Sequence, residues 1–346
     1  MEVVMKNRSI FCVTLIILLC FGAAALFAAR DKPAEGELEL TEIVLQFQPN
    51  TLFAVQSVAL EKGWFEEAGF EKVIIKNFTS GNLAGEALIA GELSMWVPGN
   101  MPVISMRHNG VPIVVTGMLN VCPAEYLMVR NDAGVSKPED LYDISIGLMV
   151  GSTAQGVLWN LVNKYGLDNE RLNVVNLAPP EQITALRNNE IQALLVWPPA
   201  AYKVKDIATY MFDSKDLSHT NVPMVFAESF IKKYPNTARA LMEVLYRGQD
   251  WVADQSNWDE AKKIHAKRSE QPLELVEEMW LDYWNPKQPN GHLDQDFVDD
   301  FRGYTAFQKA TGRIQEPISD ILEYTYTGIL EEIRPSYVKV KGLWTP

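Results

Sequence analysis

The chain has few cysteines and histidines. Cys12 and Cys20 lie within the first 29 residues, so Cys122 is the one thiol in the rest of the sequence and has no partner for an internal disulfide. The four histidines are scattered, and neither an HExxH nor a CxxC spacing occurs, which argues against a His/Cys metal site. We therefore expect no metal, no cofactor and no catalytic residue, with Cys122 buried as a small apolar side chain.

Positive charge is also scarce. The 346 residues include 31 Lys and Arg against 44 Asp and Glu, which gives a formal net charge of −13. Nucleic-acid binding depends on clustered Lys and Arg that neutralise phosphates, so this composition excludes nucleic acid as a partner. A hydrophobic fraction of 47% indicates a folded chain, and the length exceeds what one hydrophobic core usually serves. We expect two lobes.

One long uncharged apolar run occurs, near the N-terminus. Lys6 and Arg8 precede this run, which extends from Ile10 to Ala29 and ends in small residues. The order is typical of a secretory signal peptide, with an A-x-A cleavage signal at Ala23 to Ala25. The same run is long enough to span a bilayer, so a retained anchor is the alternative. We expect residues 1–29 to be a signal peptide or membrane anchor, and the rest to be periplasmic or otherwise extracytoplasmic.

Short β-rich runs alternate with helical patterns through the first and middle parts of the chain. A strand over Ile43–Phe47 precedes a helix over Leu52–Lys62, and a strand over Ile144–Leu148 precedes a helix over Ala154–Tyr165. This alternation predicts parallel α/β sheets. A similar A-L-x-x-x-E-[L/I] phrase begins at Ala87 and at Ala185, which supports two halves of like topology. From about Phe230 onward helices dominate, the last predicted over Ile318–Leu330.

The candidate binding residues follow the predicted strands. In open α/β sheets, ligands bind beyond the carboxyl ends of the strands, where the N–H groups of helix starts point outward. Trp96 is an aromatic candidate under this rule. We expect the ligand to contact Gln48, Asn50, Phe53, Ser80, Gly81, Asn82, Gly99, Asn100, Ser152, Thr153, Gln155, Trp197 and Tyr202.

The turn Gly151-Ser152-Thr153 is the most informative of these segments. Glycine lets the backbone approach a ligand, and the two hydroxyls add donors to the free amides of the helix start; simple helix capping is the alternative role. None of the selected loops contains Lys or Arg, and none pairs titratable side chains. We therefore expect neutral donors around an aromatic-walled site, and binding without turnover.

Four phrases together carry a family resemblance. They are ALEKGWFEEAGF at Ala59–Phe70, GSTA at Gly151–Ala154, VWPP at Val196–Pro199 and KYP at Lys233–Pro235. In this order and spacing, the chain resembles the substrate-binding proteins of ABC importers for sulfonates, nitrate and taurine, a group that includes NMT1-like pyrimidine-precursor binders. The resemblance extends from about Glu42 to Thr327.

The resemblance implies an α/β class structure, the two-lobed periplasmic-binding-protein type II fold. Each lobe would be a mostly parallel sheet flanked by helices, with a helical C-terminal region. Crossovers near Cys122–Val129 and Val222–Phe226 would place residues 40–124 in lobe 1, 125–225 in lobe 2 and 226–335 again in lobe 1. A small organic solute (a sulfonate, nitrate, taurine or a pyrimidine-like compound) would bind in the cleft of a monomer and pass to an ABC permease and its ATPase.

Two features leave the function open in detail. The family often has Asp where this chain has Ser94 and Gln192, and an acidic residue where it has Pro198, which predicts different polar partners for the ligand. An enzyme on the same fold, of the kind used in menaquinone or thiamine-pyrimidine biosynthesis, is the alternative function. The predicted export segment opposes that alternative because those pathways run in the cytoplasm.

Overall fold

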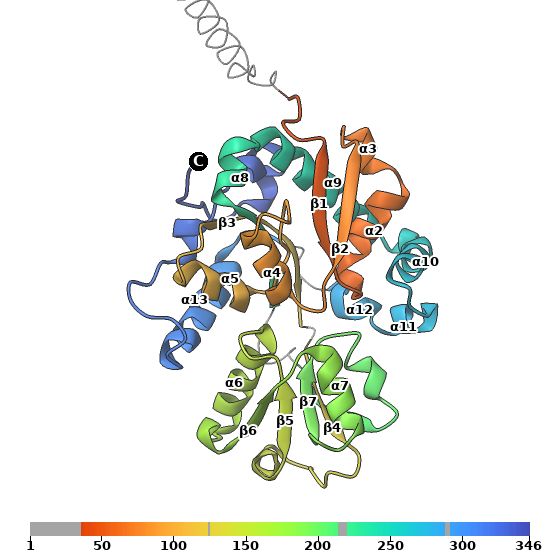
Figure 1. Cartoon of the computed structure of the whole chain (residues 1–346), viewed down its shortest axis with the longest axis vertical. Coiled ribbons are helices and arrows are strands. Elements are labelled where there is room, and N and C mark those ends of the chain that lie inside the picture. Colours follow the sequence, from red (N-terminus) through yellow and green to blue (C-terminus); the bar gives the residue numbers. More distant parts are fainter. Residues whose placement is uncertain (1–35, 124, 214–219, 288–290) are drawn as a thin grey trace, which may run out of the picture.

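The computed structural model describes residues 36–123, 125–213, 220–287 and 291–346. The predicted signal peptide or anchor, residues 1–29, lies outside the described residues. The described chain forms two lobes, and both of its ends lie in the larger one (Figure 1). The larger lobe holds residues 36–123 together with those from 220 onward, and the smaller lobe holds residues 125–213.

The larger lobe is built on two pairs of strands. β1 and β2 are parallel, whereas β3 and β9 are antiparallel. Single bridges from Leu45 to Met95 and from Trp96 to Val225 place the segment 95–96 between the two pairs. The strands of this lobe are β1 (Glu42–Phe47), β2 (Lys72–Asn77), β3 (Ile113–Cys122) and β9 (Thr220–Ala227).

The smaller lobe contains a five-stranded sheet in the order β6-β5-β7-β4-β8. β5 is parallel to β6 and β7, but β4 is antiparallel to β7 and β8. The sheet is therefore mixed: β4, which enters from the larger lobe, runs against the other four strands, which share one direction. Its strands are β4 (Tyr126–Arg130), β5 (Ser145–Leu148), β6 (Asn173–Asn176), β7 (Ala193–Val196) and β8 (Ala208–Asp213).

The expected repetition of topology is present. In the larger lobe β1 lies between β2 and the segment 95–96, and in the smaller lobe β5 lies between β6 and β7 in the same way. The next strand in each order, β9 or β4, is one that adjoins a crossover. The two A-L-x-x-x-E phrases begin in equivalent helices, α4 (Gly81–Ile89) and α7 (Pro179–Arg187). The sequence boundary between 125–225 and 226–335 divides β9, which pairs along its length with β3 of the larger lobe.

Helices cover both sheets. In the larger lobe they are α2 (Ala54–Glu61), α3 (Trp64–Glu67), α4, α5 (Asn100–His108), α8 (Glu228–Lys233), α9 (Pro235–Ala253), α10 (Trp258–Ser269), α11 (Leu273–Glu278), α12 (Trp280–Tyr283), α13 (Gln295–Ala310) and α14 (Gly328–Ile333). The smaller lobe has α6 (Thr153–Tyr165) and α7. α6 ends at Gly166, whose φ of 65° is a conformation that glycine adopts without a steric cost.

The helix predicted over Ile318–Leu330 does not form as one element. A short 3-10 helix at Ile321–Tyr324 is followed by extended backbone and then by α14. The interruption occurs because Thr325 bridges Val115 and the Tyr326 amide donates to the Val115 carbonyl at 2.7 Å. β-branched Thr and aromatic Tyr suit this added strand position, and tertiary pairing with β3 overrides the helical pattern.

Each lobe has its own hydrophobic core. One continuous cluster fills the larger lobe, and two clusters cover the two faces of the smaller lobe's sheet. The cores give each lobe the means to move as a unit about the crossovers. Over the described residues, no helix is both long enough and apolar enough to cross a membrane.

Candidate ligand-binding cleft

A cavity of about 80 Å³ lies between the two lobes. Both lobes contribute to its wall, together with residues beside the crossovers. The lining residues are Gln48, Asn50, Leu52, Phe53, Gly81, Asn82, Val97, Pro98, Gly99, Pro102, Cys122, Glu125, Ser152, Thr153, Trp197, Thr220, Val222 and Tyr283.

Most of the predicted contact residues lie on this wall. They are Gln48, Asn50, Phe53, Gly81, Asn82, Gly99, Ser152, Thr153 and Trp197. They converge because each follows a strand of one of the two sheets, and the carboxyl ends of those strands face the interlobe space. Ligand contact by these residues remains a prediction.

Four predicted residues lie off the wall. Ser80 is fully buried and caps α4 by accepting from the Leu83 amide at 3.4 Å. Asn100 is fully buried in the first turn of α5, and Gln155 accepts from the Gly151 amide at 2.9 Å. Tyr202 points toward the larger lobe, where its hydroxyl donates to Asp282 at 2.9 Å. These side chains shape the turns and the lobe contact.

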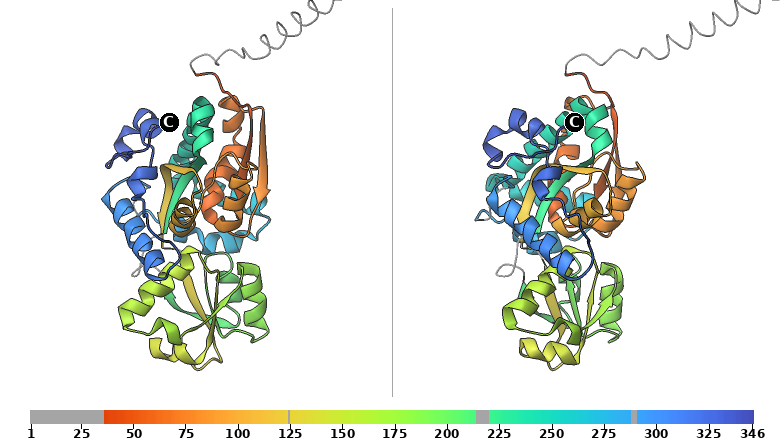
Figure 2. Two further views of the ribbon diagram at one scale, coloured as in Figure 1. Left: turned by 60° about the vertical axis from the view of Figure 1, so that its left-hand side comes forward. Right: turned by 90° about the vertical axis from the view of Figure 1, so that its left-hand side faces the viewer.

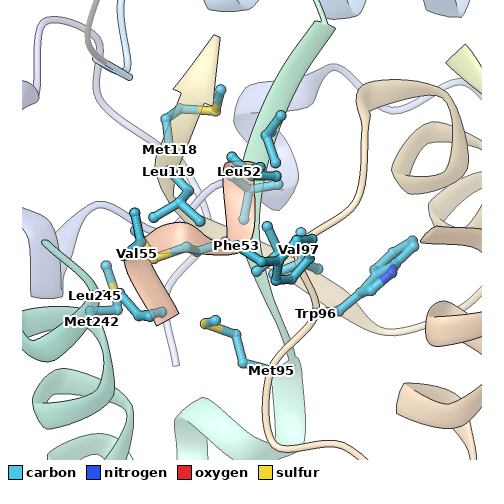
Figure 3. Close-up of a cluster of buried hydrophobic side chains, with 14 of the residues drawn as sticks. Leu52, Phe53, Val55, Met95, Trp96, Val97, Met118, Leu119, Met242 and Leu245 are labelled. Atoms are coloured by element: carbon cyan, nitrogen blue, oxygen red, sulfur yellow. The ribbon is translucent and has the colours of Figure 1, made fainter. Parts of the chain in front are cut away.

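Trp96 has a supporting role as well. Its side chain is fully buried, and its indole N–H donates to the Gly81 carbonyl at 2.8 Å. It therefore holds the start of α4 from behind and does not form an aromatic wall. Figure 3 shows Trp96 within the buried cluster that also contains Leu52, Phe53 and Val97. The last three also line the cavity, so the apolar core continues directly into one wall of the site.

Three helices begin at the cavity. Gly81 and Asn82 open α4, Gly99 is the N-cap of α5, and Ser152 and Thr153 are the N-cap and first residue of α6. The side chain of Ser152 does not cap α6, because its hydroxyl donates to the Met149 carbonyl at 2.6 Å. Helix starts carry partial positive charge and outward N–H groups, so the part of the cavity next to them favours an anionic or acceptor group.

The cavity wall also contains a carboxylate that no sequence motif marks. Glu125 follows the first crossover, its residue is only 3% exposed, and both carboxylate oxygens lie 2.8 Å from the Thr220 hydroxyl. The expectation of a wholly neutral site is therefore wrong. Among the described lining residues there is no Lys, Arg or His. The wall also includes Cys122 at the end of β3, Thr220 at the start of β9 and Tyr283 at the end of α12. No local motif marks these three positions.

Two of the departures from the family pattern are structural. Ser94 accepts from the Val44 amide at 3.0 Å, and Gln192 accepts from the Ser145 amide at 3.1 Å. Ser94 satisfies a backbone donor of β1 and Gln192 satisfies one of β5, and neither side chain lies on the cavity. Their neutral character therefore leaves the composition of the cavity wall unchanged.

The lobes touch on one side of the cavity through α6 and α13. A Cβ at Gly156 of α6 would overlap the ring of Tyr304, and the rings of Trp159 and Phe307 are 5.1 Å apart. Nearby, a Cβ at Gly99 would overlap the Thr153 hydroxyl. The views in Figure 2 show the C-terminal segment reaching down to the smaller lobe at this contact. We call Gly156, Trp159, Tyr304 and Phe307 the apolar contact.

On the other side the lobes meet through hydrogen bonds. Tyr126 and Tyr202 of the smaller lobe both donate to Asp282 of α12, and the Lys205 ammonium lies 3.1 Å from Glu278 of α11. Burial, followed by the proximity of Asp282, raises the pKa of both tyrosine hydroxyls above the ordinary value, so both stay protonated as donors. We call Tyr126, Tyr202 and Asp282 the tyrosine latch. With both contacts made, the structure is a closed form.

The reactive side chains of the site are suppressed. Burial, with Glu125 and Asp282 nearby, raises the pKa of the Cys122 thiol well above its usual range, which disfavours the thiolate nucleophile. His265, the buried histidine of the larger lobe core, contacts Ser57 at 3.1 Å and is not on the cavity. Within the described parts of the chain, no group of three or more His, Cys, Asp or Glu side chains has the arrangement of a metal site.

Comparison with known families places the chain. The family model described as NMT1/THI5 like matches residues 50–257, more than half of the chain. The chain belongs to the NMT1/THI5-like family. The match begins at Asn50 on the cavity wall and runs through the whole smaller lobe into α9 and beyond.

Two curated relatives are binding proteins. The taurine-binding periplasmic protein of Escherichia coli is 26% identical over 189 residues, covering 53% of this chain and 58% of that protein. The chain thus spans somewhat more than half the length of this relative. The formylaminopyrimidine-binding protein of Halalkalibacterium halodurans is 20% identical over 326 residues, covering 91% of this chain and 97% of that protein.

Solved structures share the fold. The alkanesulfonate-binding protein SsuA from Xanthomonas axonopodis pv. citri, bound to MOPS, superposes with a TM-score of 0.74 at 16% identity, covering 84% of this chain and 100% of that chain. The desulfurization enzyme DSZB also superposes, with a TM-score of 0.62 at 14% identity over 86% of this chain and 99% of that chain. The periplasmic-binding-protein fold is therefore shared by binding proteins and at least one enzyme.

Proposed function

We propose that this protein is the extracytoplasmic solute-binding component of an ABC importer. As a monomer it would bind a small organic solute between its lobes and deliver it, unaltered, to a permease driven by an ATPase. The observation that carries the proposal is the cavity whose wall both lobes share. A ligand in such a cavity contacts both lobes at once, so it binds the closed form better and shifts the hinge equilibrium toward it.

The size and lining of the cavity support a compact polar solute. A volume of about 80 Å³ is small beside the roughly 300 to 1,000 Å³ of sites for drug-sized ligands. Gln48, Asn50 and the α6 start offer polar groups, while Phe53 and Trp197 offer apolar faces. Taurine and formylaminopyrimidine, for which the two curated relatives are named, are of this general kind.

Binding without turnover is the form of the function that we propose over catalysis. The two curated relatives are named as binding proteins, and burial raises the pKa of the thiol on the cavity wall, which keeps it protonated. The shared fold of DSZB keeps an enzyme as the competing hypothesis, since fold alone does not decide function.

A thermal-shift panel on the purified protein tests the proposal. The panel contains taurine, isethionate, ethanesulfonate, nitrate, β-alanine, 3-hydroxypropionate, 4-aminopyrimidine and 4-hydroxypyrimidine, extended to further small sulfonates and pyrimidines. A ligand at 100 times its Kd should add about 2.7 kcal/mol to the free energy of unfolding. Mass spectrometry of the recovered ligand should show it unchanged, and chemical conversion would defeat the binding-only function.

Variants of the wall locate the site. Trp197→Ala removes an apolar face and Ser152→Ala alters the turn before α6, so both should weaken binding of the best panel ligand. Ser105→Ala, in α5 and away from the cavity, is the matched control and should bind normally. Unchanged affinity in both wall variants would place the ligand elsewhere.

A further inference from the structure

We infer that α12 couples the ligand cavity to the tyrosine latch, and that Thr51 and Asn120 are the positioning residues that hold α12 in place for both. The inference rests on the proposed function and extends it, because it names the element through which a bound solute favours the closed form. Neither Thr51 nor Asn120 is on the cavity wall, so neither contacts the solute itself. Figure 1 shows α12 at the lower edge of the larger lobe, next to the smaller lobe.

Consecutive residues of α12 belong to the two sites. Asp282 accepts hydrogen bonds from Tyr126 and Tyr202 of the smaller lobe, whereas Tyr283 lines the cavity. Successive residues of a helix project about 100° apart, so one short turn can face both sites. Asp282 is 7% exposed and Tyr283 is 5% exposed. A shift of this one turn therefore moves the acceptor of the latch and a part of the cavity wall together.

Thr51 joins α12 to the cavity wall at both ends of the helix. Its hydroxyl donates to the Met279 carbonyl at 3.2 Å, and its own carbonyl accepts from the Trp284 indole N–H at 2.7 Å. Met279 is the N-cap of α12 and Trp284 is its C-cap. Thr51 is fully buried and lies between Asn50 and Leu52, which both line the cavity. These buried hydrogen bonds are costly to leave unmade, so they keep α12 in register with this wall segment.

Asn120 joins α12 to a second segment of the wall. Its side-chain amide donates to the Tyr283 carbonyl at 2.8 Å, and the residue is 6% exposed. Asn120 belongs to β3, whose last residue, Cys122, lines the cavity. A helix of four residues is too short to be stable by itself, so its contacts with these two segments decide where Asp282 lies.

The carboxylate of the latch also acts on the cavity wall. After burial and Glu125, Asp282 is a cause of the raised pKa of the Cys122 thiol, and after burial it is the next cause of the raised pKa of both latch tyrosines. A solute that fits the wall leaves Asp282 aligned with its two donors. A solute that displaces Tyr283 misaligns them, and hydrogen bonds weaken steeply with angle.

Thr51→Val tests the first positioning residue, because it keeps the shape of the side chain and removes the hydroxyl. With the tightest-binding solute of the panel, calorimetry should show affinity at least fivefold weaker than that of wild type. The loss should appear as faster dissociation in stopped-flow measurements. Thr116→Val is the matched control and should bind normally, since Thr116 is also fully buried but donates to the Met224 carbonyl of β9, at 3.3 Å.

The same substitution in a protein without the latch donors separates positioning from a merely structural role. In Tyr126→Phe/Tyr202→Phe, Asp282 has lost both tyrosine hydroxyls, so its exact position no longer affects closure through them. Thr51→Val should weaken binding less than twofold in this background. A residue that only shapes the wall would cost the same factor in both backgrounds, and a double-mutant cycle measures the difference.

Asn120→Ala keeps the inference testable if Thr51→Val does not fold. It removes the donor to the Tyr283 carbonyl and should give the same pattern, at least fivefold weaker binding with the latch tyrosines and less than twofold without them. Asn257→Ala is its matched control. Asn257 donates to the Trp251 carbonyl at 2.9 Å and is not on the cavity wall, so affinity should be unchanged.

The outcomes separate the two proposals. Wild-type affinity in both Thr51→Val and Asn120→Ala, or equal weakening with and without the latch tyrosines, would overturn this inference while the solute-binding function stands. If no member of the extended panel binds, the proposed function fails and this inference fails with it.

Discussion

The two contacts that hold the lobes together differ in chemistry. The apolar contact packs α6 against α13, with Gly156 under Tyr304 and Trp159 beside Phe307. The tyrosine latch instead joins Tyr126 and Tyr202 to one carboxylate. Apolar packing depends on shape and has little directional preference, whereas a hydrogen bond fixes distance and angle. The apolar contact therefore sets how closely the lobes approach, and the latch sets their register.

Filling the space under Tyr304 should have the largest effect. Gly156→Val puts a side chain where the Tyr304 ring lies in the closed form, while an open form relieves the overlap. Overpacking of about 1 to 3 kcal/mol corresponds to binding weaker by up to about 100-fold, measured by calorimetry with the best panel ligand.

Gly303→Val in α13 is the matched control for this substitution. A Cβ at Gly303 meets nothing within 4 Å, so the same change there should leave affinity unchanged. Small-angle scattering should show Gly156→Val more extended than wild type when both are mixed with ligand. Equal affinity and equal dimensions for the two variants would show that the apolar contact is not needed for closure.

Breaking one arm of the latch should have a smaller effect. Tyr202→Phe deletes a hydroxyl that donates to Asp282 at 2.9 Å. A hydrogen bond to a charged group contributes about 1.5 to 3 kcal/mol, and partial exposure of the site reduces this, so affinity should fall about tenfold. The loss should appear as faster ligand dissociation in stopped-flow measurements.

Tyr210→Phe provides the comparison for the latch. Tyr210 is 54% exposed, and its ring contacts Tyr126 without entering the latch. It should bind ligand at the wild-type rate. If both phenylalanine variants release ligand at that rate, the latch does not hold the closed form.

Alkaline pH should loosen the latch and leave the apolar contact intact. The pKa values of Tyr126 and Tyr202 are raised in the closed form, so their contribution to closure is fully present below the ordinary pKa of about 10 and is lost as pH rises above it. Half a pH unit above 10 should weaken binding about fourfold for each tyrosine whose pKa falls to the ordinary value on opening. Affinity measured from pH 9 to 10.5 should show a shallower decline in Tyr202→Phe, and an equal slope would contradict this assignment.

The ion pair beside the latch should matter least. Lys205 and Glu278 are about half exposed, and such pairs contribute roughly 0 to 1 kcal/mol. Lys205→Met should weaken binding less than about fivefold, and the difference from wild type should disappear in 1 M salt, where the Debye length is about 3 Å. A difference that persists in high salt would indicate that the contact of the Lys205 ammonium with the Tyr202 ring, 3.9 Å from the ring centre, is the important part.

Much of the cavity wall was predictable from local patterns. Gln48, Asn82 and Thr153 each follow a strand in a strand-turn-helix unit, and parallel topology brings such turns to one edge of a sheet. The turn residues that proved structural, Ser80 and Gln155, have the same local pattern as those on the wall. Their roles differ only in the direction of the side chain, which a linear pattern does not contain.

The acidic part of the cavity wall, at Glu125, was not predictable in this way. Glu125 follows a crossover and Thr220 lies at the start of β9, so their hydrogen bond joins residues far apart in the chain. Tyr283 reaches the cavity from α12, in a C-terminal region where the sequence shows only helical periodicity. Periodicity reports which face of a helix is buried and does not report what it is buried against.

The sequence by itself determined the α/β alternation, the repeated half, the family and the turns on the cavity wall, because these depend on interactions within a few residues or on phrases shared with relatives. Only the tertiary structure decided the place of Glu125 on the cavity wall, the addition of Thr325 to β3 and the two unlike lobe contacts. Each of these joins segments distant in the chain, and such contacts are set by the packing of the whole fold.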